Sequence, residues 1–432
     1  MSSSAPTSVG SRRGFLKSTS GLAALLALQR PPSLLAAEPP SGRLRIAVIG
    51  LGRGLDHISA FTQVPNVEIA AVCDVDQRRV AAAAKKIEEK TGKAPSGVRD
   101  FRRLLDDKSI DAISIAMPNF WHAPATILGC AAGKHVYVEK PGSHNARESE
   151  LMVAAARKHK RQVQMGNQRR SMPIFIQAMH ELQAGAIGKL RFARCWYDAT
   201  RAGIGRGKLV PIPDWLDYSL WQGPVPERPY LDNLVHYNWH WRWHWGGGEL
   251  ANNGIHTLDL ARWGLGVESP QHVTCSGGRY HYDDDQESPD TTLASYDFGA
   301  SGISWDSSSC LPRKEENHPL VTFYGEGGTL SLEGNHYTVH DVNGKKLRSE
   351  TGSASDVHHF ANFADAIRSG TPLNSEIGEG QKSTRLCHLG NIAWRTRSAL
   401  TIDPKAGHIL NPTHDQQKLW TREYRKGWEP KV

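Results

Sequence analysis

A glycine-rich turn between a strand and a helix most constrains how this chain folds. The apolar, β-branched run 44–49 predicts a buried strand, and Gly50, Gly52 and Gly54 follow it directly before a helical pattern. Glycine lets the backbone turn sharply and approach a bulky anion without Cβ atoms, and the next helix points its free N–H groups at that anion. The turn, with Arg53 inside it, therefore predicts a pyrophosphate-binding loop.

A carboxylate stands where a dinucleotide-binding fold requires one. The apolar run 67–73 ends in Asp74, about 20 residues after the glycines, where such folds bind the adenosine ribose hydroxyls. Asp74 favours NAD because a carboxylate repels the 2′-phosphate of NADP, although Arg78 and Arg79 leave NADP open. Leu55 occupies the usual place of the third glycine, so we expect the helix to pack differently on the strand.

Strand and helix patterns alternate from residue 44 to residue 166, which predicts a parallel Rossmann sheet. Ligands of such sheets bind beyond the carboxyl ends of the strands. Further strands are expected at 111–116, 135–138 and 162–165, and helices at 81–90, 101–105 and 124–132. The polar side chains at the ligand edge are Asn119, His122, Glu139 and Lys140.

The chain beyond residue 166 has irregular segments rich in Pro, Trp and Gly between strand-like runs. We expect an α+β domain over 167–432 with an open, mostly antiparallel sheet, joined to a Rossmann domain over 41–166. Since an open sheet face usually needs covering, we also expect a homo-oligomer. The predicted strands are 190–196, 272–276, 291–298, 302–306, 320–324 and 329–332, and the predicted helices are 253–263, 357–368 and 380–400.

Residues 1–40 have the pattern of an export signal. A twin-arginine signature at 11–17 precedes an apolar stretch at 21–28, and the alanines at 36–37 offer a cleavage site. The prolines at 31–32 end the apolar run well short of the roughly 20 residues that span a bilayer, so cleavage is favoured over a retained anchor. We expect a periplasmic protein without stable membrane insertion that is exported folded, with its dinucleotide already tightly bound.

Composition narrows the class of protein. The chain has 432 residues, of which 39% are hydrophobic and 22% charged, as in a soluble globular protein of two or three domains. The net charge of +8 is modest and lies partly in the leader and the tail, so no nucleic-acid partner is expected. The six cysteines form no C-x-x-C pair, and Cys73 and Cys130 are expected to be buried thiols.

Two groups of residues have the chemistry for hydride transfer. Lys140, between Glu139 and Pro141, would stabilise the charge that develops on an alcohol oxygen as hydride leaves; the alternative is a surface lysine paired with Glu139. His256 and Asn252 are four residues apart and share a helix face. An imidazole can accept a hydroxyl proton near neutral pH and an amide can orient that hydroxyl, although a lone helical histidine is more often structural.

Tryptophan occurs at every second position within 236–245. In an extended segment Trp239 and Trp241 would share one face, with His240 and His244 on the other. Flat aromatic rings suit a carbohydrate, and they suit the packing of a core or a subunit contact equally well. No carboxylate or cysteine completes a ligand set with the two histidines, so no metal is expected.

Together these motifs resemble those of the Gfo/Idh/MocA family of sugar and cyclitol oxidoreductases. The resemblance implies that Lys140 contacts substrate and cofactor, that His256 is the acid/base, and that Asn119 and His122 seat the nicotinamide ribose. Asn252 stands where most members carry an aspartate, and Arg170 and Asp259 join Trp239 and Trp241 as expected substrate-binding residues. The motifs are Gly50-Leu51-Gly52, Pro118-Asn119-Phe120-Trp121-His122, Glu139-Lys140-Pro141, Gly246-Gly247-Gly248, Gly254-Ile255-His256 and Asp259.

The resemblance leaves three functions open, with a dimer or tetramer as the usual assembly. The first is an oxidoreductase that acts on a sugar or cyclitol CH–OH group with tightly bound NAD or NADP. The second is a glycosidase in which transient oxidation of a ring hydroxyl acidifies the neighbouring C–H and allows elimination of the aglycone. The third is a non-catalytic binding protein, which Asn252 favours and the intact Glu139-Lys140-Pro141 disfavours.

Overall fold

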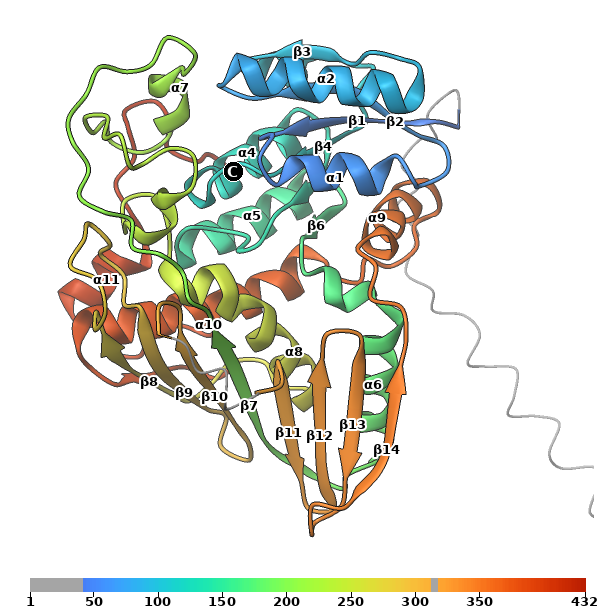
Figure 1. Cartoon of the computed structure of the whole chain (residues 1–432), viewed down its shortest axis with the longest axis vertical. Helices are drawn as coiled ribbons and strands as arrows, with labels where there is room; N and C mark the ends of the chain where they lie inside the picture. Colours follow the sequence, from blue (N-terminus) through green and yellow to red (C-terminus); the bar gives the residue numbers. More distant parts are fainter. Residues whose placement is uncertain (1–41, 312–317) are drawn as a thin grey trace, which may run out of the picture.

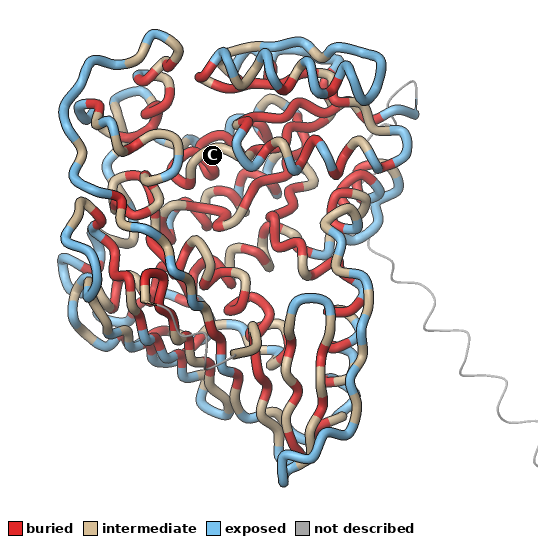
Figure 2. The backbone as a smooth tube through the Cα atoms, viewed as in Figure 1, coloured by how far each residue is buried: buried red, intermediate tan, exposed pale blue. Residues whose placement is uncertain are grey.

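The computed structural model describes residues 42–311 and 318–432. The predicted export signal at 1–40 lies outside the described residues. The described chain contains two sheets, drawn at the top and bottom of Figure 1, with helices between them. Figure 2 shows that buried residues concentrate on the strands and on these intervening helices.

The first sheet is parallel throughout and has the strand order β3-β2-β1-β4-β5-β6. Side chains alternate across it: Ile46 and Val48 pack on one face, and Ala47 and Ile49 on the other. The predicted Rossmann arrangement is confirmed. The strands are β1 (Leu44–Ile49), β2 (Val67–Cys73), β3 (Ser96–Val98), β4 (Ala112–Ile115), β5 (His135–Val138) and β6 (Val163–Met165).

Helices cover both faces of this sheet. The face of Ile46 packs against α1 (Gly54–Phe61), α2 (Gln77–Thr91) and α9 (Val357–Ser369). The opposite face packs against α3 (Arg102–Asp106), α4 (Asn119–Ala131) and α5 (Ala146–Lys158). Helix α9 comes from far along the chain, and its Phe360 ring stacks on Tyr137 with centroids 4.6 Å apart. The C-terminal part of the chain therefore completes the packing of the first sheet, which no local pattern predicts.

The second sheet has nine strands in the order β14-β13-β12-β11-β7-β10-β9-β8-β15. All its pairs are antiparallel except β7 with β10, so the predicted open, mostly antiparallel sheet is confirmed. The strands are β7 (Leu190–Asp198), β8 (His272–Gly278), β9 (Thr291–Asp297), β10 (Gly302–Ser308), β11 (Val321–Gly325), β12 (Gly328–Glu333), β13 (His336–His340), β14 (Lys346–Thr351) and β15 (Leu400–Thr401).

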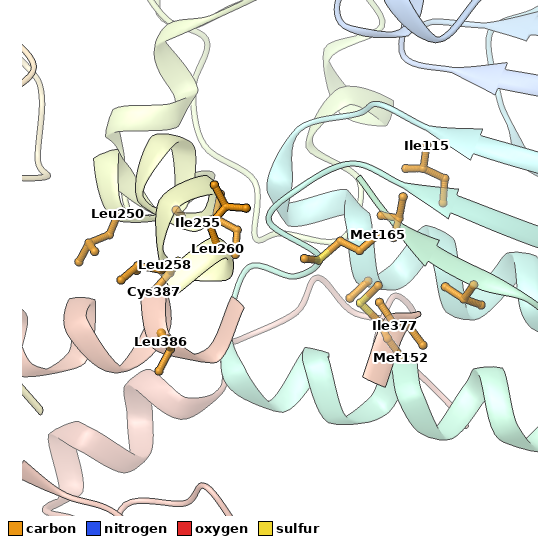
Figure 3. Close-up of a cluster of buried hydrophobic side chains, with 14 of the residues drawn as sticks. Ile115, Met152, Met165, Leu250, Ile255, Leu258, Leu260, Ile377, Leu386 and Cys387 are labelled. Atoms are coloured by element: carbon orange, nitrogen blue, oxygen red, sulfur yellow. The ribbon is translucent and has the colours of Figure 1, made fainter. Parts of the chain in front are cut away.

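Helix α10 (Ile377–Thr396) joins the two halves. Figure 3 shows its Ile377 beside Met152 and Met165 of the Rossmann half, and its Leu386 and Cys387 near α8. The remaining helices are α6 (Pro173–Gln183), α7 (Tyr218–Gln222), α8 (Ile255–Leu265), α11 (His414–Trp420), the 3₁₀ turns η1 (Gln168–Ser171) and η2 (Asn238–Trp241), and the π-turn η3 (Leu250–Gly254). Within the described ranges no helix is long and apolar enough to cross a bilayer.

Three expectations about local structure are wrong. Helix α10 ends at Thr396 because Arg397 is left-handed, and Leu400 lies in a strand instead. Helix α4 begins at Asn119, five residues earlier than expected, so Asn119 and His122 lie in its first turns. The segment 236–245 is not extended, since it contains the 3₁₀ turn η2; its tryptophans therefore do not share one face.

Candidate active site

The glycine loop between β1 and α1 fits a backbone that comes close to its neighbours. Gly50 has φ +87°, and a Cβ there would lie 2.6 Å from the carbonyl carbon of Ala116 at the end of β4. Gly54 opens α1, where a Cβ would lie 3.1 Å from Val48. Gly54 therefore allows the close helix–strand packing that the third glycine usually gives, one residue before its usual position at Leu55.

Asp74 follows β2 and fixes this loop. Its carboxylate oxygens accept hydrogen bonds from the backbone N–H groups of Leu51, at 2.7 Å, and Asp76, at 2.9 Å. Arg79 and Arg99 line the same end of the cavity described next, and the buried Nε of Arg99 has no hydrogen-bond partner. The surroundings of Asp74 thus leave polar groups for a ligand that reaches this edge of the sheet.

A cavity of about 760 Å³ runs from the glycine loop to the helices of the second domain. Its wall contains most of the predicted site residues: Gly50, Gly52, Arg53, Asp74, Asn119, His122, Glu139, Lys140, Trp239, Asn252 and His256. These residues come from the carboxyl edge of the first sheet and from η2, η3 and α8. A cavity of this size accommodates a small molecule or cofactor between two domains.

Glu139 is held in a buried network. Its carboxylate lies 3.0 Å from Nε2 of His57, accepts from Gln168 at 3.0 Å and pairs with Arg53 at 3.4 Å. Burial by itself would raise the pKa of Glu139, but the His57 hydrogen bond and the charges of Arg53 and Lys140 outweigh it and lower that pKa. Glu139 is therefore an ionised anchor for the cofactor edge.

Lys140 and Asn252 meet across the two domains. Lys140 Nζ donates to the backbone carbonyl oxygen of Asn252 at 2.8 Å and lies 3.4 Å from its side-chain Oδ1. Burial lowers the pKa of Lys140, although the charge of Glu139 opposes the change. Asn252 lies in η3 and His256 in the first turn of α8, and both line the cavity. The structure therefore brings the three predicted catalytic residues into one wall.

His256 has the electrostatic surroundings of a base. Burial and the charges of Lys140 and Arg169 lower its pKa well below 6.5, so the imidazole is neutral near neutral pH. Its ring makes no hydrogen bond to any other residue that the structure describes. A neutral, unengaged imidazole on a cavity wall can accept a hydroxyl proton.

Three predicted substrate-binding residues lie off the cavity wall. Arg170 and Asp259 form a buried ion pair, with Nε of Arg170 2.8 Å from a carboxylate oxygen of Asp259. Trp241 is 1% exposed, and its ring packs under Arg201, with the guanidinium carbon 3.9 Å from the ring centroid. Each of these side chains makes a structural contact and none of the three lines the cavity, so their role in substrate binding stays a prediction. Gly54 also lies off the wall and serves helix packing.

His122 links two loops at the edge of the sheet. Its ring nitrogens lie 2.6 Å from the carbonyl oxygen of Pro141 and 2.7 Å from that of Met117, so it ties the loop after β5 to the loop after β4. Asn119 opens α4 and lines the cavity. Both residues are thus placed where the N-terminus of α4 approaches a ligand.

Several cavity residues escaped prediction: Gln168, Arg169, Tyr237, His240 and Asp356. The position of η1 directly after the last parallel strand could have indicated Gln168 and Arg169, because that strand end is a ligand edge. His240 stacks on Trp239 with ring centroids 3.6 Å apart, and burial lowers its pKa to about 3. No cluster of three or more metal-ligating side chains occurs within 42–311 and 318–432.

Residues 213–236 contribute Leu220, Trp221 and His236 to the wall of the cavity. Arg78 lies 3.8 Å over the ring of Trp215, and the backbone N–H of Asp217 donates to the carbonyl oxygen of Val75 at 3.2 Å. On the other side Trp121 Nε1 donates to the carbonyl oxygen of Trp221 at 2.8 Å. This segment, called the cover segment below, spans from the loop after β2 to helix α4.

Family models match both halves of the chain. Residues 44–167 match the model of an oxidoreductase family with an NAD-binding Rossmann fold, and residues 195–430 match that family's C-terminal alpha/beta domain. The chain belongs to the Gfo/Idh/MocA family. The resemblance noted from the motifs is therefore confirmed, together with the NAD-binding character of the first domain.

Individual Gfo/Idh/MocA-type relatives match parts of the chain. An alpha-N-acetylgalactosaminidase of Shewanella oneidensis is 32% identical over 179 residues, covering 36% of this chain and 39% of that protein. An inositol 2-dehydrogenase of Salmonella paratyphi B is 32% identical over 151 residues, covering 34% of this chain and 43% of that protein. The chain thus matches about two fifths of the length of these curated relatives.

A solved structure shares the fold. The aldose-aldose oxidoreductase from Caulobacter crescentus, solved with glycerol, superposes with a TM-score of 0.65 over 83% of this chain and 100% of that one, at 20% identity. At this identity the likeness establishes the common two-domain architecture of the Gfo/Idh/MocA fold.

Proposed function

We propose that this chain is an oxidoreductase that removes hydride from a CH–OH group of a sugar or cyclitol and retains its own NAD. One observation carries the proposal: Lys140 and His256, from different domains, line the same cavity as the glycine loop. The residues fit a dinucleotide because Gly50, Gly52 and Asp74 line the cavity, and the buried Nε of Arg99 is unpartnered at the same end. Bound NAD would supply the hydride acceptor.

His256, Lys140 and Asn252 would each have a separate role in the oxidation of the alcohol. Neutral His256 accepts the hydroxyl proton, and its lowered pKa keeps it unprotonated beforehand. The Lys140 ammonium donates a hydrogen bond to the reacting oxygen, held in place by the Asn252 carbonyl. The amide of Asn252 can donate to one hydroxyl and accept from another, so it orients the ring without exchanging protons.

The cofactor site would be held by residues at the edge of the first sheet. The glycine loop and the N-terminus of α4 offer backbone N–H groups to the pyrophosphate. Asp74 faces the adenosine ribose, and Arg53 lies inside the loop while paired with Glu139 and Asp356. Asp74 would repel the 2′-phosphate of NADP, whereas Arg79 and Arg99 on the same cavity wall could bind that phosphate. NADP is therefore the less favoured cofactor.

The proposal is tested by adding sugars and cyclitols to purified protein and following reduction of its bound nicotinamide by absorbance. Wild-type protein is expected to form bound NADH, and Lys140→Ala or His256→Ala to slow this by about 10²-fold or more. If both variants reduce NAD at the wild-type rate, the assigned roles are wrong. Unaltered dinucleotide content in each variant is the control for folding.

A glycosidase that uses NAD transiently is the second candidate. The cover segment favours it, because Trp221 lines the cavity and the segment is fastened by contacts of Trp215 and Asp217, so a bound dinucleotide would exchange slowly and be restored in place. The match to an alpha-N-acetylgalactosaminidase also supports it. Release of the aglycone from an aryl glycoside without net NADH would establish this reaction, and no release across a panel of glycosides would exclude it.

We also infer export by the twin-arginine pathway and assembly into a dimer or tetramer. The support for export is the signature at 11–17. All six cysteines are free, which suits a chain folded in a reducing compartment before transport. The support for assembly is the open face of the nine-stranded sheet. Cell fractionation of the full chain tests the first inference, and light scattering of the purified protein tests the second.

A further inference from the structure

Arg169 is a cavity residue whose charge has no assigned partner. It follows β6 in η1 and lines the cavity, and its guanidinium carbon lies 6.0 Å from the ring centroid of Phe175. No hydrogen bond or ion pair joins it to another residue in the described ranges. Its neighbour Arg170 behaves differently, since it is paired with Asp259 at 2.8 Å. Two adjacent arginines thus have opposite roles, one structural and one facing the ligand space.

The charges around Arg169 leave this end of the cavity positive. Arg169 lowers the pKa of both Lys140 and His256, so it lies within electrostatic range of the reacting groups. The carboxylate of Asp356 is bound to Arg53 at 3.1 Å, and Glu139 is engaged by several donors. Burial lowers the pKa of Arg169, although the charges of Asp356 and Asp259 oppose the change. Each of these carboxylates is itself paired, Asp356 with Arg53 and Asp259 with Arg170.

The Arg169 side chain is half-buried on the cavity wall, and a partly desolvated cation there favours an anionic ligand. Its planar fork of parallel N–H donors fits a carboxylate with two hydrogen bonds. The dinucleotide phosphates would have their own cradle at the glycine loop, which follows β1, whereas η1 follows β6 at the edge of the same sheet. The anion that Arg169 binds is thus expected on the substrate.

We propose that the substrate is an acidic sugar, a uronic or aldonic acid or a glycoside of one, whose carboxylate binds Arg169 while Lys140 and His256 address a ring hydroxyl. This inference rests on the proposed oxidoreductase function and narrows its substrate class. It explains why a cation lies beside a neutral base on the wall of the cavity. It applies equally to net oxidation and to the transient oxidation of a glycosidase.

The test compares matched sugars on the holoprotein as purified. Glucuronate and galacturonate are paired with glucose and galactose, and the rate of the single reduction of the bound nicotinamide, measured against sugar concentration, gives a second-order rate constant for each. The uronates are expected to be favoured by about 10-fold or more, and Arg169→Gln to remove most of that preference through the lost charged hydrogen bonds. Arg169→Lys is expected to retain part of the preference. Arg79→Gln, at the far end of the cavity, leaves the acid-to-neutral ratio unchanged.

Other outcomes distinguish a failure of the acidic-sugar assignment from a failure of the proposed oxidoreductase function. Equal rates for acidic and neutral sugars, a preference for sugar phosphates or sulfates, or equal losses on both classes in Arg169→Gln would overturn the acidic-sugar assignment. Loss of bound dinucleotide in Arg169→Gln would reassign the residue to the cofactor. Thermal shifts by uronates that depend on Arg169, without any nicotinamide reduction, would support the acid site and overturn the redox function.

Discussion

Lys140 Nζ donates to the backbone carbonyl oxygen of Asn252 at 2.8 Å, and this bond links the two domains at the reacting end of the cavity. Lys140 follows the fifth parallel strand, whereas Asn252 lies in the π-turn that leads into α8. The position of Lys140 therefore depends on how the domains pack, and the Asn252 side chain, 3.4 Å away, can tune its charge.

Replacing Asn252 by aspartate is expected to raise the pKa of Lys140. Burial lowers that pKa in the wild type, and a carboxylate in place of the amide would stabilise the ammonium. The alkaline limb of the rate of nicotinamide reduction should therefore move to higher pH in Asn252→Asp. The control is Asn343→Asp, which adds the same charge at an exposed position between β13 and β14. An unchanged alkaline limb would show that Asn252 does not act on Lys140.

The fall in the rate of nicotinamide reduction at acid pH should reflect protonation of His256. Because its pKa is lowered well below 6.5, the base stays neutral down to pH values below the usual histidine range. The rate is thus expected to be level from pH 8 to about pH 6.5 and to fall only in more acidic solution. His256→Asn should abolish this limb along with most of the rate. A limb centred at or above 6.5 would contradict the assignment.

Gly50→Ala should remove dinucleotide binding. A Cβ at this position meets backbone atoms of Ala116 and Met117 within 2.8 Å, so the β1–α1 loop cannot keep its course. Gly133→Ala is the matched control, because Gly133 has nearly the same φ, +82° against +87°, but open space around it. The control should lose about 1–2 kcal/mol of stability from backbone strain and keep its NAD. Retained NAD in Gly50→Ala would refute the close-approach argument.

Glu139 should make stability depend on pH. Its lowered pKa means that the ionised carboxylate stabilises the fold above the ordinary value of 4.5, and this contribution declines as pH falls below it. Glu139→Gln leaves the buried cationic partners without their anion and should cost about 3 kcal/mol of unfolding free energy at pH 7. The difference from wild type should shrink on acidification. Denaturant unfolding at pH 7 and pH 4 measures it, and a pH-independent difference would be contrary to the network.

The cover segment should control how fast the dinucleotide exchanges. Trp215→Ala removes the ring under Arg78 and is expected to speed exchange of bound NAD for isotopically labelled NAD by about 5-fold, the loss of a cation–π contact of about 1 kcal/mol. Tyr280→Ala, a 66% exposed aromatic outside the cavity, serves as the control. Equal exchange rates in the two variants would show that the cover segment is not the reason why the protein retains NAD.

Local patterns predicted the parts of the site that depend on a few consecutive residues. The Gly50 turn, Lys140 at the end of β5, and Asn252 with His256 four residues later all lie on the wall of one cavity, as their spacing suggested. The alternation of apolar residues also predicted both sheets. Each of these features is set by strand or helix periodicity, which a sequence displays directly.

Long-range packing explains what could not be predicted. Arg169 and Arg170 are adjacent and alike in sequence, and only the folded chain shows that Arg170 pairs with Asp259 whereas Arg169 lies over the ring of Phe175 on the cavity wall. The 3₁₀ turn η2 directs Trp241 toward Arg201. Trp239 and Trp241 therefore do not share the face that an extended segment would have given them. Helix α9 returns to cover the first sheet through Phe360, a contact between residues more than 200 positions apart.

The central claim is that the cavity holds a captive NAD, and mass spectrometry of the ligand released from purified, denatured protein tests it most directly. The account predicts NAD at close to one molecule per chain. Folded protein that releases no dinucleotide and binds none when NAD is added would contradict it.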